Sequence, residues 1–276
     1  MPFASGGSVV SRRWQPGPLH WVTGGTHLAG VAAIAVQPAL WPWAVGAMLG
    51  SHALNLAFVL SPATTAFGPV IATLPPAAAG RSEIALTFDD GPDPVVTPRV
   101  LDVLDAAGVH ATFFCVGSRA RAHPQLVQAI VARGHEVENH AFTHALTFAF
   151  YGIGRMARDI GAAQQALTDI TGVAPRYFRA PFGLRTPLTE PALARLGLDC
   201  VAWSIRSFDS IDSNSLRVAA RIARRLVPGS IVLLHDGAEV RVTRGTPSVL
   251  GALPLVLTRI REKNWRCVTL RAALSA

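Results

Sequence analysis

The chain has 276 residues, of which 50% are hydrophobic and 15% are charged, and its formal net charge at pH 7 is +8. This length suits one main domain with a substantial core and an accessory segment. The positive charge does not indicate a nucleic-acid partner, because Lys263 is the only lysine among the 25 basic residues and the arginine bias follows the alanine-rich composition. Three cysteines without a CxxC pair argue against a disulfide framework and against a cysteine metal site.

The N-terminal part of the chain is apolar and uncharged. Between Arg13 and Arg81 there is no Asp, Glu, Lys or Arg. Residues 21–40 and 43–60 each approach the roughly 20 apolar residues that cross a bilayer. The tryptophans and prolines between them suit a turn at a membrane interface. We therefore predict an N-terminal tail over 1–20, followed by a membrane-anchoring transmembrane helical hairpin over 21–60.

Polar side chains within the two apolar segments leave alternatives open. His27, His52 and Asn55 make both segments less apolar than typical spans. One alternative is a pair of buried helices in a soluble protein. A cleaved signal peptide is a weaker alternative, because the apolar region is longer than that of a typical signal peptide.

The charges that flank the hairpin predict its orientation. With Arg12 and Arg13 inside, a two-span hairpin in a bacterial-type inner membrane returns the rest of the chain to the cytoplasmic side, whereas a single span places it outside. Residues 61–80 contain four prolines and predict a Pro-rich linker.

From Glu83 onward, short β-rich runs alternate with helical stretches, which is typical of parallel strands joined by crossover helices. The predicted strands are 84–88, 111–115, 136–139, 177–179, 199–202, 231–234 and 266–270. Helical periodicity covers 95–108, 123–134, 154–172, 189–197, 215–229 and 247–264. The pattern predicts an α/β fold, a distorted (β/α)7 barrel with its site at the C-terminal ends of the strands.

Chemically active side chains follow these strands, so they should meet at one rim. Asp89 and Asp90 end the first strand as neighbours, where each carboxylate raises the pKa of the other unless a cation binds one of them. His140 and His144 are four residues apart and can point to one side of a helical turn. One carboxylate and two imidazoles are typical of a hydrolytic zinc site, and the second carboxylate can then act as a base.

Four motifs in order carry a resemblance to a known family. They are TFDDGP at 87–92, HAFTH at 140–144, RAPFG at 179–183 and LLH at 233–235. With them, the segment from about Ile84 to Leu270 resembles the polysaccharide deacetylase, or NodB-homology, family, which is carbohydrate esterase family 4. The resemblance implies a deacetylase domain over 81–276 that removes an N-acyl, usually N-acetyl, group from an amino sugar in a metal-dependent reaction.

The resemblance also implies a role for each matching residue. Asp89 is implied to be the catalytic base, supported by Arg179, and His235 the acid that protonates the leaving amine. The implied ligands of a divalent metal, for which Zn²⁺ is the first expectation, are Asp90, His140 and His144. The N–H of Phe182 is implied to bind the oxyanion, and Leu233 to line the acyl pocket.

Three positions depart from the family pattern. Ala141 stands where Ser or Thr usually follows the first metal histidine. In the motif Asp-x-x-Asp-Trp, whose counterpart is RSFDS, Arg206 replaces the first Asp and Ser210 replaces Trp. An acidic residue that tunes the histidine acid is then either Asp209 or Asp236, and the sequence leaves both open.

The expected function is that of a membrane-anchored, metal-dependent hydrolase acting on an acylated amino sugar in a poly-, oligo- or lipid-linked saccharide. The expected partners are this saccharide or glycolipid and the bilayer, with no nucleic acid or protein partner. Two alternatives remain. One is a deformylase or esterase on a related lipid-linked sugar, and the other is a degraded carbohydrate-binding protein, which the three departures motivate.

Overall fold

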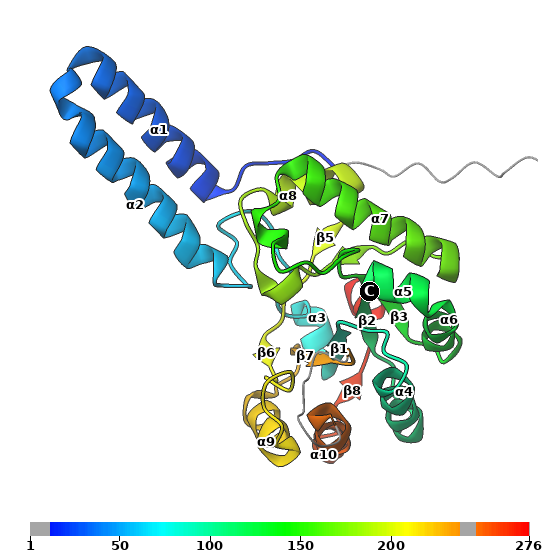
Figure 1. The fold of residues 1–276 in the computed structure, drawn as a ribbon. Helices are drawn as coiled ribbons and strands as arrows, with labels where there is room; N and C mark the ends of the chain where they lie inside the picture. Colours follow the sequence, from blue (N-terminus) through cyan, green and yellow to red (C-terminus); the bar gives the residue numbers. More distant parts are fainter. Residues whose placement is uncertain (1–11, 238–246, 276) are drawn as a thin grey trace, which may run out of the picture.

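A parallel sheet organises the C-terminal domain (Figure 1). The computed structural model describes residues 12–237 and 247–275. The strands are β1 (Glu83–Asp89), β2 (Thr112–Cys115), β3 (Glu136–Asn139), β4 (Tyr177–Phe178), β5 (Asp199–Cys200), β6 (Ile205–Arg206), β7 (Ile231–His235) and β8 (Arg266–Cys267). Their order is β5-β4-β3-β2-β1-β7-β6, and β8 also pairs with β1. Every strand pair is parallel, as the alternation of strands and helices predicts.

The helices of this domain mostly connect the strands and cover the outer side of the sheet (Figure 1), but its first and last helices pack on the inner side, with Ala85 and Phe114. They are α3 (Pro76–Gly80), α4 (Val96–Ala107), α5 (Gly117–Ala122), α6 (Pro124–Ala132), α7 (Ile153–Thr171), α8 (Thr189–Leu196), α9 (Ser215–Arg225), α10 (Ser248–Glu262) and α11 (Leu270–Leu274). Several end on a glycine in the left-handed region, such as Gly108 after α4 and Gly172 after α7, where a side chain would be strained.

The predicted α/β class is confirmed, but the sheet is a half-barrel of seven parallel strands and not a closed barrel. Strands β5 and β6 are its two ends, and no ladder joins them in the described chain. The extended run 199–206 pairs with β4 at its start and with β7 at its end. Between these pairings, Val201 forms a bridge to Ile71 instead, so the two ends stay apart.

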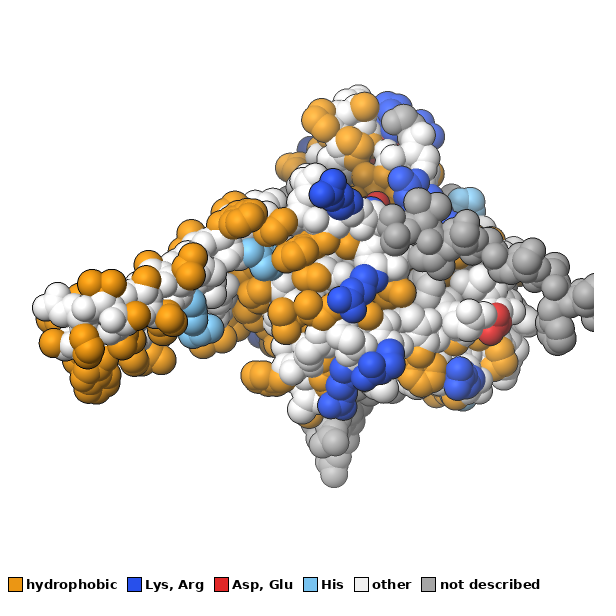
Figure 2. Space-filling view, turned by 90° about the horizontal axis from the view of Figure 1, so that it is seen from above, with side chains coloured by type: hydrophobic (Ala, Val, Ile, Leu, Met, Phe, Trp, Pro, Cys, Tyr) orange, Lys and Arg blue, Asp and Glu red, His pale blue; other side chains and the backbone are white. Residues whose placement is uncertain are grey.

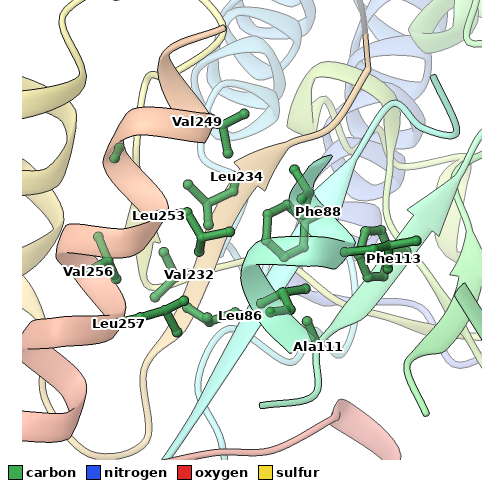
Figure 3. Close-up of a cluster of buried hydrophobic side chains, with 14 of the residues drawn as sticks. Leu86, Phe88, Ala111, Phe113, Val232, Leu234, Val249, Leu253, Val256 and Leu257 are labelled. Carbon is green, nitrogen blue, oxygen red and sulfur yellow. The ribbon is translucent and has the colours of Figure 1, made fainter. Parts of the chain in front are cut away.

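Alternation along β1 separates the core from the site. Leu86 and Phe88 belong to the main hydrophobic cluster, beneath Leu253 of α10 (Figure 3). The intervening Thr87 and Asp89 point to the other side of the strand, because successive side chains alternate. The carboxylate at the end of β1 is therefore directed toward the inside of the half-barrel.

The segment 61–80, predicted as a linker, lies against this domain. Phe67 and Ala78 are fully buried, and Leu74 is nearly so. Thr73 forms a bridge to Ser230. The prolines give an extended path, and apolar side chains along it pack into the domain.

Two helices, α1 (Pro18–Val36) and α2 (Trp41–Val59), form an arm that projects from the domain (Figure 1). They pack against each other, and the side-chain amide of Asn55 donates to the hydroxyl of Thr23 at 2.7 Å. By length and composition, α1 is the described helix that could cross a membrane. Figure 2 shows hydrophobic side chains along the arm, which has no charged residue.

Candidate active site

The C-terminal strand ends enclose one polar pocket of about 270 Å³. Its lining residues are Asp89, Asp90, His140, His144, Phe182, Gly183, Trp203, Arg206, Ser210, Ile211, Leu233 and His235. A larger apolar groove of about 570 Å³ lies between α4 and α10, and Arg261 is its only charged lining residue. Hydrolysis requires convergent acid and base groups, so the polar pocket is the candidate active site.

Asp90, His140 and His144 come together as predicted, and their ligand atoms lie within 4.8 Å of one another. Oδ1 of Asp90 lies 3.2 Å from Nε2 of His140 and 3.1 Å from Nε2 of His144. Asp90 directly follows β1 and the histidines follow β3, so the segments after two strand ends build the group.

The hydrogen bonds of His140 show that this group fits a cation. Its Nδ1 lies 2.8 Å from the carbonyl oxygen of Arg179, which can only accept a hydrogen bond, so the proton of a neutral ring sits on Nδ1. The Nε2 lone pair then faces the carboxylate of Asp90, which is repulsive unless a positive charge lies between them. Histidines that bind a metal typically donate a hydrogen bond from their other ring nitrogen to a carbonyl in this way.

The pKa shifts of Asp90 and His140 also favour a positive charge between these two side chains. Burial raises the pKa of Asp90, but hydrogen bonds from His140 and His144 hold it well below its usual range. Burial lowers the pKa of His140, but Asp89 and Asp90 raise it above its usual value. A ring proton or a bound divalent cation would satisfy this arrangement.

Strained backbone conformations gather at the pocket. Positive φ angles occur at Asp90 (73°), Ala141 (62°), His144 (48°), Phe182 (59°) and Phe208 (60°). Non-glycine residues rarely adopt this region, and surrounding structure must hold them there. The clustering marks the pocket as a site where geometry is imposed on the chain.

Two residues that sequence reasoning missed, Asn139 and Asp159, support the turn that carries His140 and His144. Ala141 is fully buried, and its N–H donates to the side-chain oxygen of Asn139 at 2.9 Å. The carboxylate of Asp159 on α7 accepts from the N–H of Phe142 at 2.8 Å and from the hydroxyl of Thr143 at 2.7 Å. The turn is thus held without the hydroxyl that Ala141 lacks. No pattern in the sequence distinguishes Asp159 from other charged helix residues.

Asp89 and Arg179 form the predicted pair. Nη1 of Arg179 donates to Oδ1 of Asp89 at 2.7 Å and to the hydroxyl of Thr87 at 2.8 Å, while Nη2 donates to the carbonyl of Ala202 at 2.9 Å. The guanidinium also lies 4.1 Å from the ring centroid of Phe114. Both partners of the pair are buried, so the orientation of the Asp89 carboxylate is fixed.

His235 contacts Asp209 and not Asp236. Its Nδ1 lies 2.7 Å from Oδ1 of Asp209, and its backbone N–H donates to Oδ2 at 2.9 Å. Asp236 accepts instead from the hydroxyl of Thr97 at 2.6 Å. Burial lowers the pKa of His235, but Asp209 outweighs it and raises the value to about 9. Of the two carboxylates that the sequence left open, Asp209 therefore sets the charge of the histidine.

The remaining predicted residues also reach the pocket. Leu233 is buried and lines the pocket from β7. The ring of Phe182 lies 4.7 Å from that of His144, centroid to centroid. Trp203 lines the pocket as well and supplies an aromatic wall where Ser210 has none. Its position at the end of a predicted strand was the available signal.

Comparisons with known proteins agree on one family. Residues 77–201 match the profile of the polysaccharide deacetylase family. The chitooligosaccharide deacetylase of Sinorhizobium fredii is 39% identical over 166 residues, which cover 60% of this chain and 77% of that protein. A peptidoglycan-N-acetylglucosamine deacetylase of Bacillus cereus is 32% identical over 199 residues, covering 69% of this chain and 67% of that protein. The crystal structure of the Bc1960 peptidoglycan N-acetylglucosamine deacetylase matches with a TM-score of 0.68 and 26% identity, covering 75% of this chain and 93% of that chain.

Proposed function

Because this chain belongs to the polysaccharide deacetylase family, carbohydrate esterase family 4, which hydrolyses N-acetyl amide bonds in carbohydrates, we propose that it is a membrane-anchored, metal-dependent deacetylase of an amino sugar. Its substrate is a poly-, oligo- or lipid-linked saccharide. The observation that carries the proposal is that one pocket contains a carboxylate held by an arginine, an Asp-His-His group and a histidine paired with a carboxylate.

Asp90, His140 and His144 are the residues that would hold the divalent cation, and zinc suits their nitrogen and oxygen donors. When bound, the cation supplies Lewis-acid polarisation of the acyl carbonyl and of the attacking water. Asp89 accepts the proton of that water, and the hydrogen bond from Arg179 keeps its carboxylate aimed into the pocket. The N–H of Phe182 donates to the oxyanion, and Leu233 receives the acyl methyl group.

His235 completes the reaction as the acid. The amine is a poor leaving group until its nitrogen is protonated, so the C–N bond breaks as Nε2 of His235 gives up its proton. Asp209 holds Nδ1 and stabilises the charged ring before this step. The water oxygen ends in acetate and the nitrogen leaves as a free amine.

Acyl release from a panel of N-acetylated saccharides tests this function. We expect the full-length protein to release acetate with added zinc, and Asp89→Asn to lose at least about 100-fold in kcat, as removal of a catalytic base does. Release of formate, or cleavage only of esters, would favour the deformylase or esterase alternative. Saccharide binding without acyl release at any metal loading would identify a degraded binding protein.

Two features support the membrane anchor. The arm carries exposed apolar side chains such as Trp21, Leu28 and Trp43, and exposed apolar surface of this kind is typical of membrane or protein contacts. Ahead of α1, Arg12 pairs with Glu190 and donates its N–H to the carbonyl of Ala194 at 3.0 Å. The tail and the domain therefore contact each other at one end of the arm, as a two-span hairpin requires.

Reporter fusions test the topology. We expect a reporter at residue 276 to be cytoplasmic and one inserted at Ala39, between the two helices, to be outside, because Arg12 and Arg13 stay inside. A periplasmic reporter at residue 276 would indicate a single span. Recovery of the full-length protein without detergent would favour buried helices in a soluble protein.

A further inference from the structure

Arg206 projects a positive charge into the candidate active site. It ends β6 and pairs in register with Leu233, the predicted acyl-pocket residue, two positions before His235 on β7. Arg206 also lines the same pocket as Asp90. A cation at this place is the reverse of the acidic residue that the family pattern has there.

Each nearby carboxylate of the described chain is committed to another partner. Asp209 accepts from His235 and from the hydroxyl of Ser207. Asp212 forms ion pairs with Arg217 at 2.8 Å and with Arg221 at 2.9 Å. The two carboxylates that line the pocket also have partners, Asp89 in Arg179 and Asp90 in the two histidines. Among the described residues, no carboxylate forms an ion pair with Arg206.

Arg206 is held in place by aromatic rings. Its guanidinium carbon lies 5.0 Å from the ring centroid of Phe208 and 5.8 Å from that of Trp203. Its Nε is buried and has no hydrogen-bond partner within the described residues. Cation–π contacts orient a guanidinium but leave its N–H donors free, and a buried donor without a partner is costly. The side chain is therefore positioned to bind an oxyanion.

We propose that Arg206 is a specificity-determining residue for an anionic substrate, an N-acetyl amino sugar with a phosphate or carboxylate on or next to the ring that is deacetylated. The proposal rests on the proposed deacetylase function. A guanidinium offers paired N–H donors to both kinds of oxyanion. At about 270 Å³ the pocket is below the usual range of ligand sites, so the anion lies close to the sugar. The apolar arm favours phosphate, the group that joins sugars to membrane lipids.

Competing substrates test the proposal on the full-length protein. The probes are N-acetylglucosamine 1-phosphate, N-acetylmuramic acid and uncharged di-N-acetylchitobiose, compared by kcat/KM at fixed salt and zinc. We expect the wild type to prefer an anionic probe, and Arg206→Gln to reduce that preference about tenfold to a hundredfold, mainly through KM. Arg206→Lys should restore part of it. Preference for the first probe indicates phosphate, and preference for the second a carboxylate.

Arg224→Gln is the matched control, because Arg224 is exposed on α9 and outside the pocket. We expect it to keep the wild-type preference. Equal loss on all three probes in Arg206→Gln, or a wild type without preference, would overturn the proposal. Melting temperatures show whether each variant is folded.

Equilibrium binding separates this proposal from the proposed function. Calorimetry with N-acetylglucosamine 1-phosphate and zinc compares the wild type with Arg206→Gln. Binding that needs Arg206 without any deacetylation would keep the anion subsite and refute the deacetylase. Deacetylation, together with phosphate binding that persists in Arg206→Gln, would refute the anion subsite and keep the deacetylase. The anion would then be bound by the metal and not by Arg206.

Discussion

At the scale of single residues, the charge of His235 depends on Asp209. Burial alone favours the neutral imidazole, and the carboxylate at 2.7 Å reverses this preference and raises the pKa of His235 to about 9. The acid form is present below that pKa and is lost as the pH rises through it. The same pair stabilises the fold below about pH 6.5, the ordinary histidine pKa, and this contribution disappears between about 6.5 and 9.

We predict that Asp209→Asn moves the alkaline limb of the pH–rate profile to lower pH. Without the carboxylate of Asp209, burial lowers the pKa of His235. The acid form is then lost at a pH roughly one to two units lower than in the wild type. The profile of kcat/KM measures the shift. Ser207→Ala is the control, since it removes a hydrogen bond at 2.5 Å to Asp209 but keeps the charge. An unchanged alkaline limb in Asp209→Asn would show that His235 is not the acid.

The sequence located the proposed catalytic and metal-binding residues better than the residues that position them. Asp89, His140 and His235 fall at strand ends, so alternation and topology predict that they meet. Asn139 and Asp159 hold the ligand turn through hydrogen bonds, which depend on how α7 packs near β3. Packing of this kind is not encoded in local spacing.

At the scale of elements, the Asp-His-His group joins the end of β1 to the turn after β3. Neither segment has enough donors alone, since the residue after β1 supplies the carboxylate of Asp90 and the turn after β3 supplies His140 and His144. Asp90 and His144 both have positive φ angles. A bound cation should therefore stabilise the connection between the two strand ends.

We predict that zinc raises the melting temperature of the wild type and that His140→Ala abolishes this rise. Metal that binds only the folded state stabilises it in proportion to the logarithm of its concentration. Elemental analysis after equilibration with limiting zinc should find about one metal per chain in the wild type and none in His140→Ala or Asp90→Ala.

His110→Ala is the matched control, because this exposed histidine lies outside the pocket. It should bind zinc and respond to it as the wild type does. Equal metal content in wild type and His140→Ala would exclude the proposed site.

Long periodic helices and apolar strands could be predicted, and so could the short strands β4, β5 and β8, whereas the short elements α3, α11 and β6 could not. Helix α7 spans 19 residues with a clear apolar face, so its pattern is readable. Helices α3 and α11 have five residues each, and β6 has two. Elements so short have no stability of their own, and tertiary contacts decide their conformation.

At the scale of the whole molecule, the segment 61–80 joins the arm to the half-barrel by packing. Arg185 is buried, and its Nη1 donates to the carbonyl of Thr64 at 2.7 Å. Ile71 bridges to Val201, at the opening between β5 and β6. The predicted domain boundary at residue 81 falls after these contacts.

We predict that a truncated chain of residues 61–276 folds and that one of residues 81–276 is severely destabilised. The shorter chain loses the buried side chains of Phe67 and Leu74, and deletion of each costs about 2 to 5 kcal/mol. This loss is comparable with the whole stability of a typical domain. Urea denaturation followed by circular dichroism measures both chains, and equal midpoints would confirm a boundary at 81.

Removal of the arm and of Arg12 destabilises the chain, and this effect can be separated from the loss of the segment 61–80. Glu190 is buried and pairs with Arg12, which both truncated chains lack, and Arg185 Nη2 remains 3.9 Å away. Burial already raises the pKa of Glu190, so without Arg12 the carboxylate is poorly compensated, a costly state for a buried charge. We expect Glu190→Gln to stabilise the 61–276 chain and to destabilise the full-length protein. This change of sign would show that the N-terminal segment is part of the folded domain and not only the proposed membrane anchor.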